Sequence, residues 1–144
     1  MSCGYIYVAS NSVGGVKENN YINEAIFSAK SLRKVDPNAN ITLFTDTIVK
    51  QNVFNEVKRV ETSLRCKQKF LLESPYDKTI LLDSDTYINS SITDLFDMLD
   101  KYEMVACNDY ARKRIFNIPE YMKIPYAFSE INSGMVAFKK CDNF

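Results

Sequence analysis

Two aspartates separated by one residue, Asp83 and Asp85, are the side chains of this sequence best suited to chemistry. They directly follow an apolar run, residues 79–82, which is typical of a buried strand. In extended backbone, residues i and i+2 point to the same side, so both carboxylates could face one cation. Two carboxylates that leave the other coordination positions to water and a diphosphate suit Mg²⁺ or Mn²⁺. The pair predicts a metal site at the carboxyl end of a strand, where open α/β sheets bind ligands.

The spacing of the pair is weak evidence without its surroundings. The chain holds ten Asp in 144 residues, and chance alone predicts about 0.7 such pairs in a chain of this composition. The surroundings add weight, because an apolar strand precedes Asp83 and a capping box, Ser91-Ile92-Thr93-Asp94, opens a helix after Asp85. A solvated turn at the end of a strand is the alternative interpretation, and both stay open at this point.

The amino-acid composition further restricts the kinds of catalytic and metal site that this chain can form. The chain has no histidine, which excludes His-based acid–base chemistry, Ser-His-Asp and Cys-His nucleophiles and His-ligated zinc within it. Its four cysteines include no C-x-x-C pair, and Cys3 and Cys107 border apolar runs, which predicts that they are buried. The 18 basic and 18 acidic residues give a formal net charge of zero, so no global field attracts nucleic acid.

No targeting or membrane segment is recognisable. The first residues lack a basic region, and no run approaches the ~20 apolar residues that a membrane span needs. Two glycosylation sequons, at Asn40 and Asn89, lie inside or beside predicted strands, where a glycan would be awkward. We therefore expect a cytoplasmic protein without a membrane span.

Short, continuously apolar runs alternate with helical patterns along one chain of single-domain length. Strands are expected at residues 4–9, 41–45, 53–60, 79–82, 104–107 and 135–138. Helices are expected at about 20–34, capped by Asn19 or Asn20, at 67–73, and after the capping box. Residues 110–129 are aromatic and irregular. This alternation predicts a single α/β domain, residues 1–144, with a mostly parallel sheet flanked by helices.

With these residues in view, the chain resembles nucleotide-sugar glycosyltransferases of the GT-A fold, and most of all the glycogenin and galactinol synthase type, family 8. Four features match in order. They are the first strand and loop followed by Ala25-x-x-x-Ala29-x-x-Leu32, a basic residue at Lys67, the strand ending in Asp83-Ser84-Asp85-Thr86 and continuing to Ile92-Thr93-Asp94-Leu95-Phe96, and Asn132-Ser133-Gly134 before an apolar strand. The combination is specific, whereas any one piece is not.

The resemblance implies a role for each matching residue. Asp83 and Asp85 would hold Mn²⁺ or Mg²⁺ against the diphosphate of a UDP- or GDP-sugar donor, and the metal would stabilise the diphosphate as a leaving group. Lys67 would contact the donor's phosphate or sugar, and Asn132 would act beside the transferred sugar. Further donor contacts would come from Ala9, Ser10 and Asn11 around the base and ribose, and from Ser84, Ser133 and Gly134. The implied activity is transfer of the sugar to a hydroxyl acceptor.

The sequence also departs from the family pattern. The family supplies a third metal ligand, usually histidine, from a later segment, whereas this chain has no histidine and extends ten residues past Gly134. We expect the donor-binding portion of a longer enzyme, with a catalytically incomplete remnant that binds nucleotide or a partner as the alternative.

Two other families with related motifs match less well. Haloacid-dehalogenase phosphatases place a Thr two residues after the second Asp, where this chain has Tyr87. Sugar nucleotidyltransferases need a G-x-G-T-R loop, and Gly14-Gly15 lacks the Thr and Arg.

Overall fold

The protein is described by a computed structural model that covers residues 1–10, 20–60, 67, 69–109 and 130–141. Asn11, Gly14-Gly15, Cys66 and the irregular segment 110–129 lie outside these described residues. Within them, the strands are β1 (Cys3–Val8), β2 (Ile41–Thr45), β3 (Glu56–Arg59), β4 (Lys78–Leu82), β5 (Met104–Asn108) and β6 (Ile131–Lys139). The helices are α1 (Tyr21–Val35), α2 (Lys69–Leu72) and α3 (Asp94–Met98).

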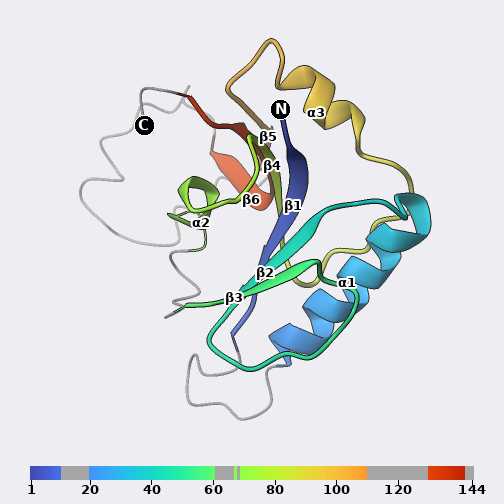
Figure 1. Ribbon diagram of the computed structural model, residues 1–144. Coiled ribbons are helices and arrows are strands. Elements are labelled where there is room, and N and C mark those ends of the chain that lie inside the picture. The colour runs from blue at the N-terminus through green and yellow to red at the C-terminus, as the bar shows by residue number, and fades with distance from the viewer. Residues whose placement is uncertain (11–19, 61–66, 68, 110–129, 142–144) are drawn as a thin grey trace.

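The six strands form one sheet in the order β3-β2-β1-β4-β6-β5 (Figure 1). β1 pairs in parallel with β2 and β4, and β2 pairs in parallel with β3. β6 runs antiparallel to both β4 and β5, so it alone opposes the direction of the other described strands. The helix between β1 and β2 supplies the crossover that a parallel pair requires. The prediction of a mostly parallel α/β sheet is confirmed.

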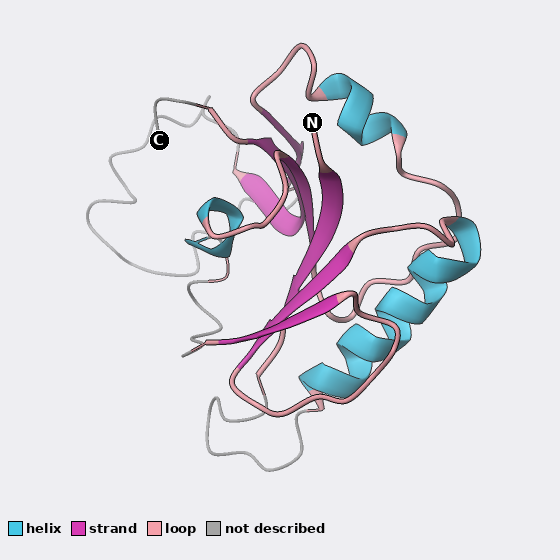
Figure 2. Cartoon of the chain, viewed as in Figure 1, coloured by secondary structure: helices cyan, strands magenta, loops and turns pink. Residues whose placement is uncertain are grey.

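The central strands β1, β2 and β4 are mainly apolar and almost entirely buried because the sheet is covered on both faces. Along β1, Tyr5 and Tyr7 face a core that includes α1 and α3, whereas Ile6 and Val8 face a second core that includes α2. α1 and α2 accordingly lie on opposite sides of the sheet (Figure 2). This double covering explains why the strand signal is a continuous apolar run rather than an alternation.

The long helix α1 begins where the sequence indicated. The Asn20 side chain accepts a hydrogen bond from the Asn23 N–H at 3.4 Å, which satisfies one of the free donors of the first turn. At the other end, the Arg33 guanidinium donates to the carbonyls of Val53 and Ala39. These bonds tie the helix to the segments on either side of β2.

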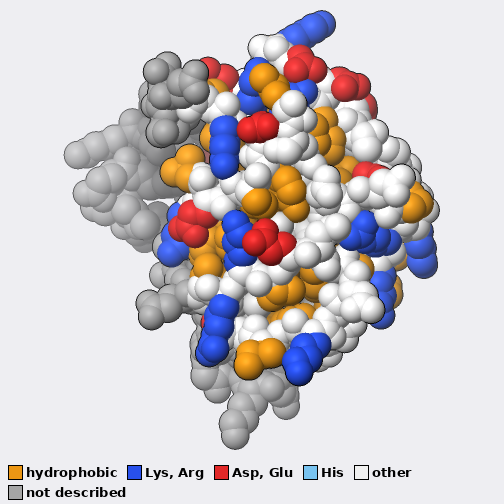
Figure 3. Space-filling view, viewed as in Figure 1, with side chains coloured by type: hydrophobic (Ala, Val, Ile, Leu, Met, Phe, Trp, Pro, Cys, Tyr) orange, Lys and Arg blue, Asp and Glu red, His pale blue; other side chains and the backbone are white. Residues whose placement is uncertain are grey.

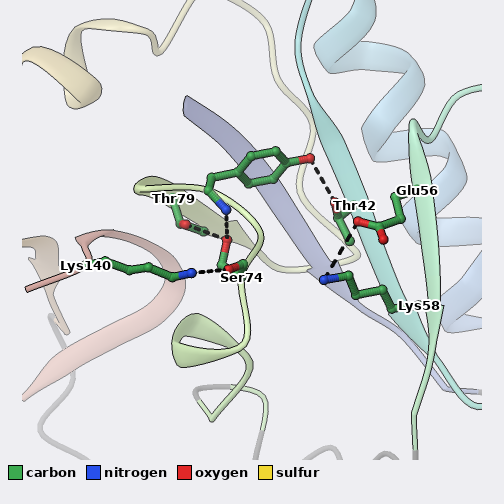
Figure 4. Close-up of polar contacts among 7 residues, drawn as sticks. Thr42, Glu56, Lys58, Ser74, Thr79 and Lys140 are labelled. Carbon is green, nitrogen blue, oxygen red and sulfur yellow. Dashed lines mark hydrogen bonds and ion pairs between the residues drawn. The ribbon is translucent and has the colours of Figure 1, made fainter. Parts of the chain in front are cut away.

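The second face of the sheet is closed by the turn between α2 and β4. Tyr76 hydrogen-bonds Thr42 on β2 with a 2.8 Å O–O distance, and Thr79 donates to Ser74 at 2.7 Å (Figure 4). A Cβ at Gly4 would lie 2.4 Å from the Tyr76 ring, so only glycine at this position of β1 allows the ring to pack there.

Three details differ from the sequence-based expectations. Asn132-Ser133-Gly134 forms the first part of β6 instead of a loop before it. The capping box does not form, because α3 begins at Asp94 without a side-chain cap and Ser91 bonds Thr93 instead. Cys107 is exposed rather than buried, because β5 is the outermost strand on its side of the sheet.

Surface charge matches the neutral composition. On the face drawn in Figure 3, basic and acidic side chains are interspersed, and no large patch of one sign stands out. No helix within the described ranges is long and apolar enough to cross a membrane.

Candidate functional site

The predicted site residues gather at one edge of the sheet. Because β1, β2 and β4 are parallel, their carboxyl ends bring Ser10, Asp46 and Asp83 to the same edge. β6 runs the other way, so its first residues reach this edge as well. The Asp83 N–H donates to the Gly134 carbonyl at 2.9 Å. The segments around residues 83 and 134, which are far apart in sequence, are therefore joined by a backbone hydrogen bond.

Asp83 lies between a lysine and β6. Its Oδ1 forms an ion pair with Lys67 Nζ, and the side chains of Lys67 and Asp83 are 19% and 33% exposed. On the other side, a Cβ at Gly134 would lie 3.4 Å from Asp83 Oδ2 and 2.9 Å from Asn132 Oδ1. The Gly134 N–H donates to that same Asn132 oxygen at 2.8 Å. The structure thus brings together Lys67, Asp83, Asn132 and Gly134, which come from three separate features of the sequence pattern.

The backbone after Asp83 is a turn, not the extended strand end that the sequence argument assumed. The Thr86 N–H and hydroxyl both donate to the Asp83 carbonyl, at 3.3 and 2.7 Å. Ser84 and Asp85 occupy the middle of this turn, and Asp85 is exposed. The premise that the two carboxylates share one side of a strand is therefore wrong, because β4 ends at Leu82.

Helix α1 holds this turn in place. Ser28 hydrogen-bonds Thr86 with a 3.0 Å O–O distance, and Tyr7 bonds Ser28 at 2.9 Å. Ser31 accepts from the Ile88 N–H at 2.8 Å. Burial raises the pKa of Tyr7 to about 12, so its phenol stays protonated and available as a donor near neutral pH.

These anchoring residues were missed by the sequence argument. A signal existed, since Ser28 and Ser31 fall on the otherwise apolar face of a helix, beside Ala25, Ala29 and Leu32. Buried hydroxyls on such a face need partners. Their partners in the turn region, Thr86 and Ile88, could not be identified because they lie 58 and 57 residues away along the chain.

The residues expected around the base and ribose are only partly described. Ala9 and Ser10 follow β1 and are fully buried. The Ser10 hydroxyl hydrogen-bonds Asp46 beyond the end of β2, and sequence reasoning did not single out Asp46. Asn11 lies outside the described residues. The donor contacts assigned to these positions stay predictions.

A cavity of about 370 Å³ lies between the first turns of α1 and the turn after β4. Its lining includes Ser84 and Asp85 but not Asp83, so the two aspartates have different neighbours. Ser84 also donates to Glu24 of α1 at 3.4 Å. Exposed rings of Phe27 and Tyr87, with centroids 5.8 Å apart, complete the cavity wall.

The side chains at this edge match the donor chemistry of a divalent metal. Asp83 and Asp85 offer carboxylate oxygens, which Mg²⁺ and Mn²⁺ prefer, and Mg²⁺ commonly takes only one or two carboxylates when phosphates complete its shell. Within the described ranges, no three His, Cys, Asp or Glu side chains are grouped so that they could hold a metal ion. A metal held by Asp83 and Asp85 alone would leave its other coordination positions to water or a phosphate ligand. One oxygen of Asp83, Oδ1, is paired with Lys67 Nζ.

No protein-family model matches the sequence, and a search of curated proteins also gives no match. Solved structures do match. The galactosyltransferase LgtC, crystallised with donor and acceptor sugar analogs, superposes with a TM-score of 0.67 at 15% identity, over 94% of this chain and 57% of that one. The glycosyltransferase GlyE of Streptococcus pneumoniae TIGR4 gives 0.62 at 16% identity, over 96% and 34%. The bifunctional IspDF of Campylobacter jejuni gives 0.53 at 13% identity, over 96% and 41%.

These likenesses concern the fold. The GT-A-type glycosyltransferases LgtC and GlyE share nearly the whole of this chain's architecture, which identifies its sheet and helices as a GT-A-like Rossmann domain. The chain spans between about a third and somewhat more than half of the length of the three matched structures.

Proposed function

We propose that this chain is the donor-binding portion of a metal-dependent glycosyltransferase, which moves a sugar from a UDP- or GDP-sugar to a hydroxyl acceptor. The observation that carries the proposal is the meeting of Lys67, Asp83 and the Asn132–Gly134 segment at the carboxyl edge of the sheet. That edge is where open α/β sheets bind ligands. The proposal includes a family 8 affiliation, a single domain over residues 1–144 and a cytoplasmic location.

Each residue has a proposed task. Asp83 and Asp85 hold Mn²⁺ or Mg²⁺, and Lys67 binds a phosphate oxygen of the donor. Asn132, a catalytic residue in this proposal, offers its amide to the transferred sugar. Ser133 and Gly134 line the same strand, and Gly134 leaves room for the Asn132 and Asp83 oxygens. Remaining donor contacts are assigned to Ala9, Ser10, Asn11 and Ser84.

The chemistry follows from the charge that develops during transfer. Breaking the bond between the sugar and the diphosphate leaves positive charge at the glycosidic carbon and negative charge on the departing phosphate. A bound metal supplies electrostatic stabilisation of that leaving group. The Lys67 ammonium adds a second positive charge, and the bond between Ser28 and Thr86 anchors the backbone turn that carries the two aspartates. The acceptor hydroxyl then attacks the same carbon, and its proton passes to the departing diphosphate.

Calorimetric titration tests the donor site. UDP, GDP, UDP-glucose and a GDP-sugar are titrated into the protein with Mn²⁺ and, separately, with EDTA. We expect one nucleotide class to bind with Mn²⁺ and to lose most of its affinity in EDTA. The double variant Asp83→Ala/Asp85→Ala should keep its circular dichroism spectrum and lose the metal-dependent part of binding. Unchanged affinity in this folded variant would refute the metal assignment.

A second candidate, a nucleotide-binding domain without turnover, is favoured by the Lys67–Asp83 ion pair, which already neutralises one of the two proposed ligands. Hydrolysis of the bound donor separates the two candidates. Release of free sugar from a UDP- or GDP-sugar in the presence of Mn²⁺ supports an enzyme. Metal-dependent binding without any release supports the binding domain.

A further inference from the structure

The ion pair between Lys67 and Asp83 neutralises one of the two carboxylates proposed as metal ligands. Lys67 lies just before α2, where its carbonyl accepts from the Phe70 N–H at 3.2 Å, so the lysine is tied to the start of this helix. The lysine side chain is 19% exposed and the aspartate side chain 33% exposed. Both charges are thus partly shielded from water. An ion pair in such a place is stronger than one on an open surface.

A metal ion arriving alone meets two costs at this site. It competes with the ammonium for the Asp83 carboxylate, whose charge the ammonium already neutralises, and the ammonium then stays near a doubly charged cation. A diphosphate removes both costs, because its oxygens accept the ammonium and also coordinate the metal. Metal and diphosphate therefore help each other to bind, through the lysine.

We propose that Lys67 is an internal counter-ion that makes metal binding at Asp83 conditional on the arrival of the donor diphosphate. This inference rests on the proposed donor site and deepens it. It assigns Lys67 a second role besides phosphate contact, which is to couple metal binding to diphosphate binding. Without a diphosphate, the lysine ammonium neutralises the Asp83 carboxylate. With a diphosphate, the same lysine moves its bond from carboxylate to phosphate.

Thermodynamic linkage makes the coupling between Mn²⁺ binding and nucleotide binding measurable as a ratio of affinities. The ratio of Mn²⁺ affinity with and without UDP or GDP equals the ratio of nucleotide affinity with and without Mn²⁺. Removal of the ammonium should raise the affinity for Mn²⁺ alone by about tenfold, and it should lower the coupling factor by a similar amount. Nucleotide affinity in the presence of Mn²⁺ should fall at the same time. The two affinities thus change in opposite directions in one variant.

The experiment measures free Mn²⁺ by electron paramagnetic resonance, without and with saturating UDP or GDP. It compares wild type with Lys67→Met, Lys67→Gln and Lys67→Arg. Lys67→Arg keeps the charge and should behave like wild type, whereas the two neutral variants should bind Mn²⁺ alone more tightly. Lys69→Met is the matched control, since Lys69 is an exposed lysine in α2 whose ammonium lies over the Phe70 ring at 4.8 Å rather than at Asp83.

The possible results distinguish a failure of the counter-ion role of Lys67 from a failure of the proposed donor site. If wild type binds nucleotide with Mn²⁺ but the folded neutral variants bind Mn²⁺ alone no better than wild type, the counter-ion role is refuted and the donor site stands. If wild type binds no nucleotide with or without Mn²⁺, the donor site itself fails. An equal gain in Lys69→Met would show a general charge effect and would also overturn the specific role of Lys67.

Discussion

The absence of a side chain has different structural consequences at Gly4 and at Gly134. Gly4 faces the ring of Tyr76, which is buried and held by its hydrogen bond to Thr42. Gly134 faces the end of the Asn132 side chain, which is exposed and can turn away. The first glycine is needed for packing, and the second keeps space open at the candidate site.

Alanine at these two positions should therefore have unequal effects on stability. Gly4→Ala would place a Cβ 2.4 Å from the Tyr76 ring, and we expect it to lower the free energy of unfolding by about 2–3 kcal/mol. Gly134→Ala requires only a shift of the Asn132 amide and should cost less than about 1 kcal/mol. Urea denaturation of both variants measures the difference. Equal losses would mean that the Tyr76 ring is not held as tightly as its contacts indicate.

At the scale of elements, α3 is joined to the sheet by a buried lysine. Lys78 on β4 is 6% exposed, and its ammonium donates to the Phe96 carbonyl at 2.8 Å and pairs with Asp100 at 2.7 Å. Phe96 and Leu99 fill the core below. A short helix of five residues has little stability of its own, so these contacts decide its position.

The ion pair between Lys78 and Asp100 predicts that the stability of the fold depends on pH. The hydrogen bond from Lys78 holds the pKa of Asp100 below its ordinary value of 3.8. A carboxylate whose folded pKa is lowered stabilises the protein above its unfolded pKa, and this contribution is lost as the pH falls through the folded value. Asp100→Asn should thus be less stable than wild type near neutral pH, and the difference should shrink in acid. Urea midpoints over this pH range measure it.

Asp97→Asn is the matched control for that series, because Asp97 lies on α3, three residues before Asp100, and is likewise exposed. It should show no comparable pH-dependent difference. A constant difference between Asp100→Asn and wild type at all pH values would argue against the charge of Asp100 as the cause.

At the scale of the whole molecule, one sheet separates two cores and belongs to both. β1, β2 and β4 place alternate residues in the core that includes α1 and in the core that includes α2. Unfolding of the sheet on one side therefore disrupts the other core as well. The solved structures of LgtC and GlyE match the fold over 94% and 96% of the chain.

The shared sheet predicts cooperative unfolding. Far-ultraviolet circular dichroism and the near-ultraviolet signal of the tyrosines should give coincident urea transitions. Gly4→Ala, which disturbs the α2 side, should shift both signals together, although Tyr5 and Tyr7 lie in the α1 core. Two separate transitions would contradict the single domain that we propose.

Local sequence signals were sufficient for most elements and for part of the site. The apolar runs of β1, β2 and β4 and the periodic pattern of α1 are strong because each element is buried along its length. Asp83 could be placed at the end of β4 for the same reason. Weak or partly exposed elements were predicted less well, as β3 and α2 are shorter than expected and α3 lacks its capping box.

What the amino-acid sequence established alone is therefore local: which runs are buried, and which polar residues follow them. Tertiary structure alone decided that Lys67 pairs with Asp83, that Ser28 holds the turn through Thr86, and that β6 brings Gly134 to the same edge. Each of these contacts joins residues from 16 to 58 positions apart. Their partners depend on strand order and direction, which no local pattern encodes, because pairing is a property of the whole sheet.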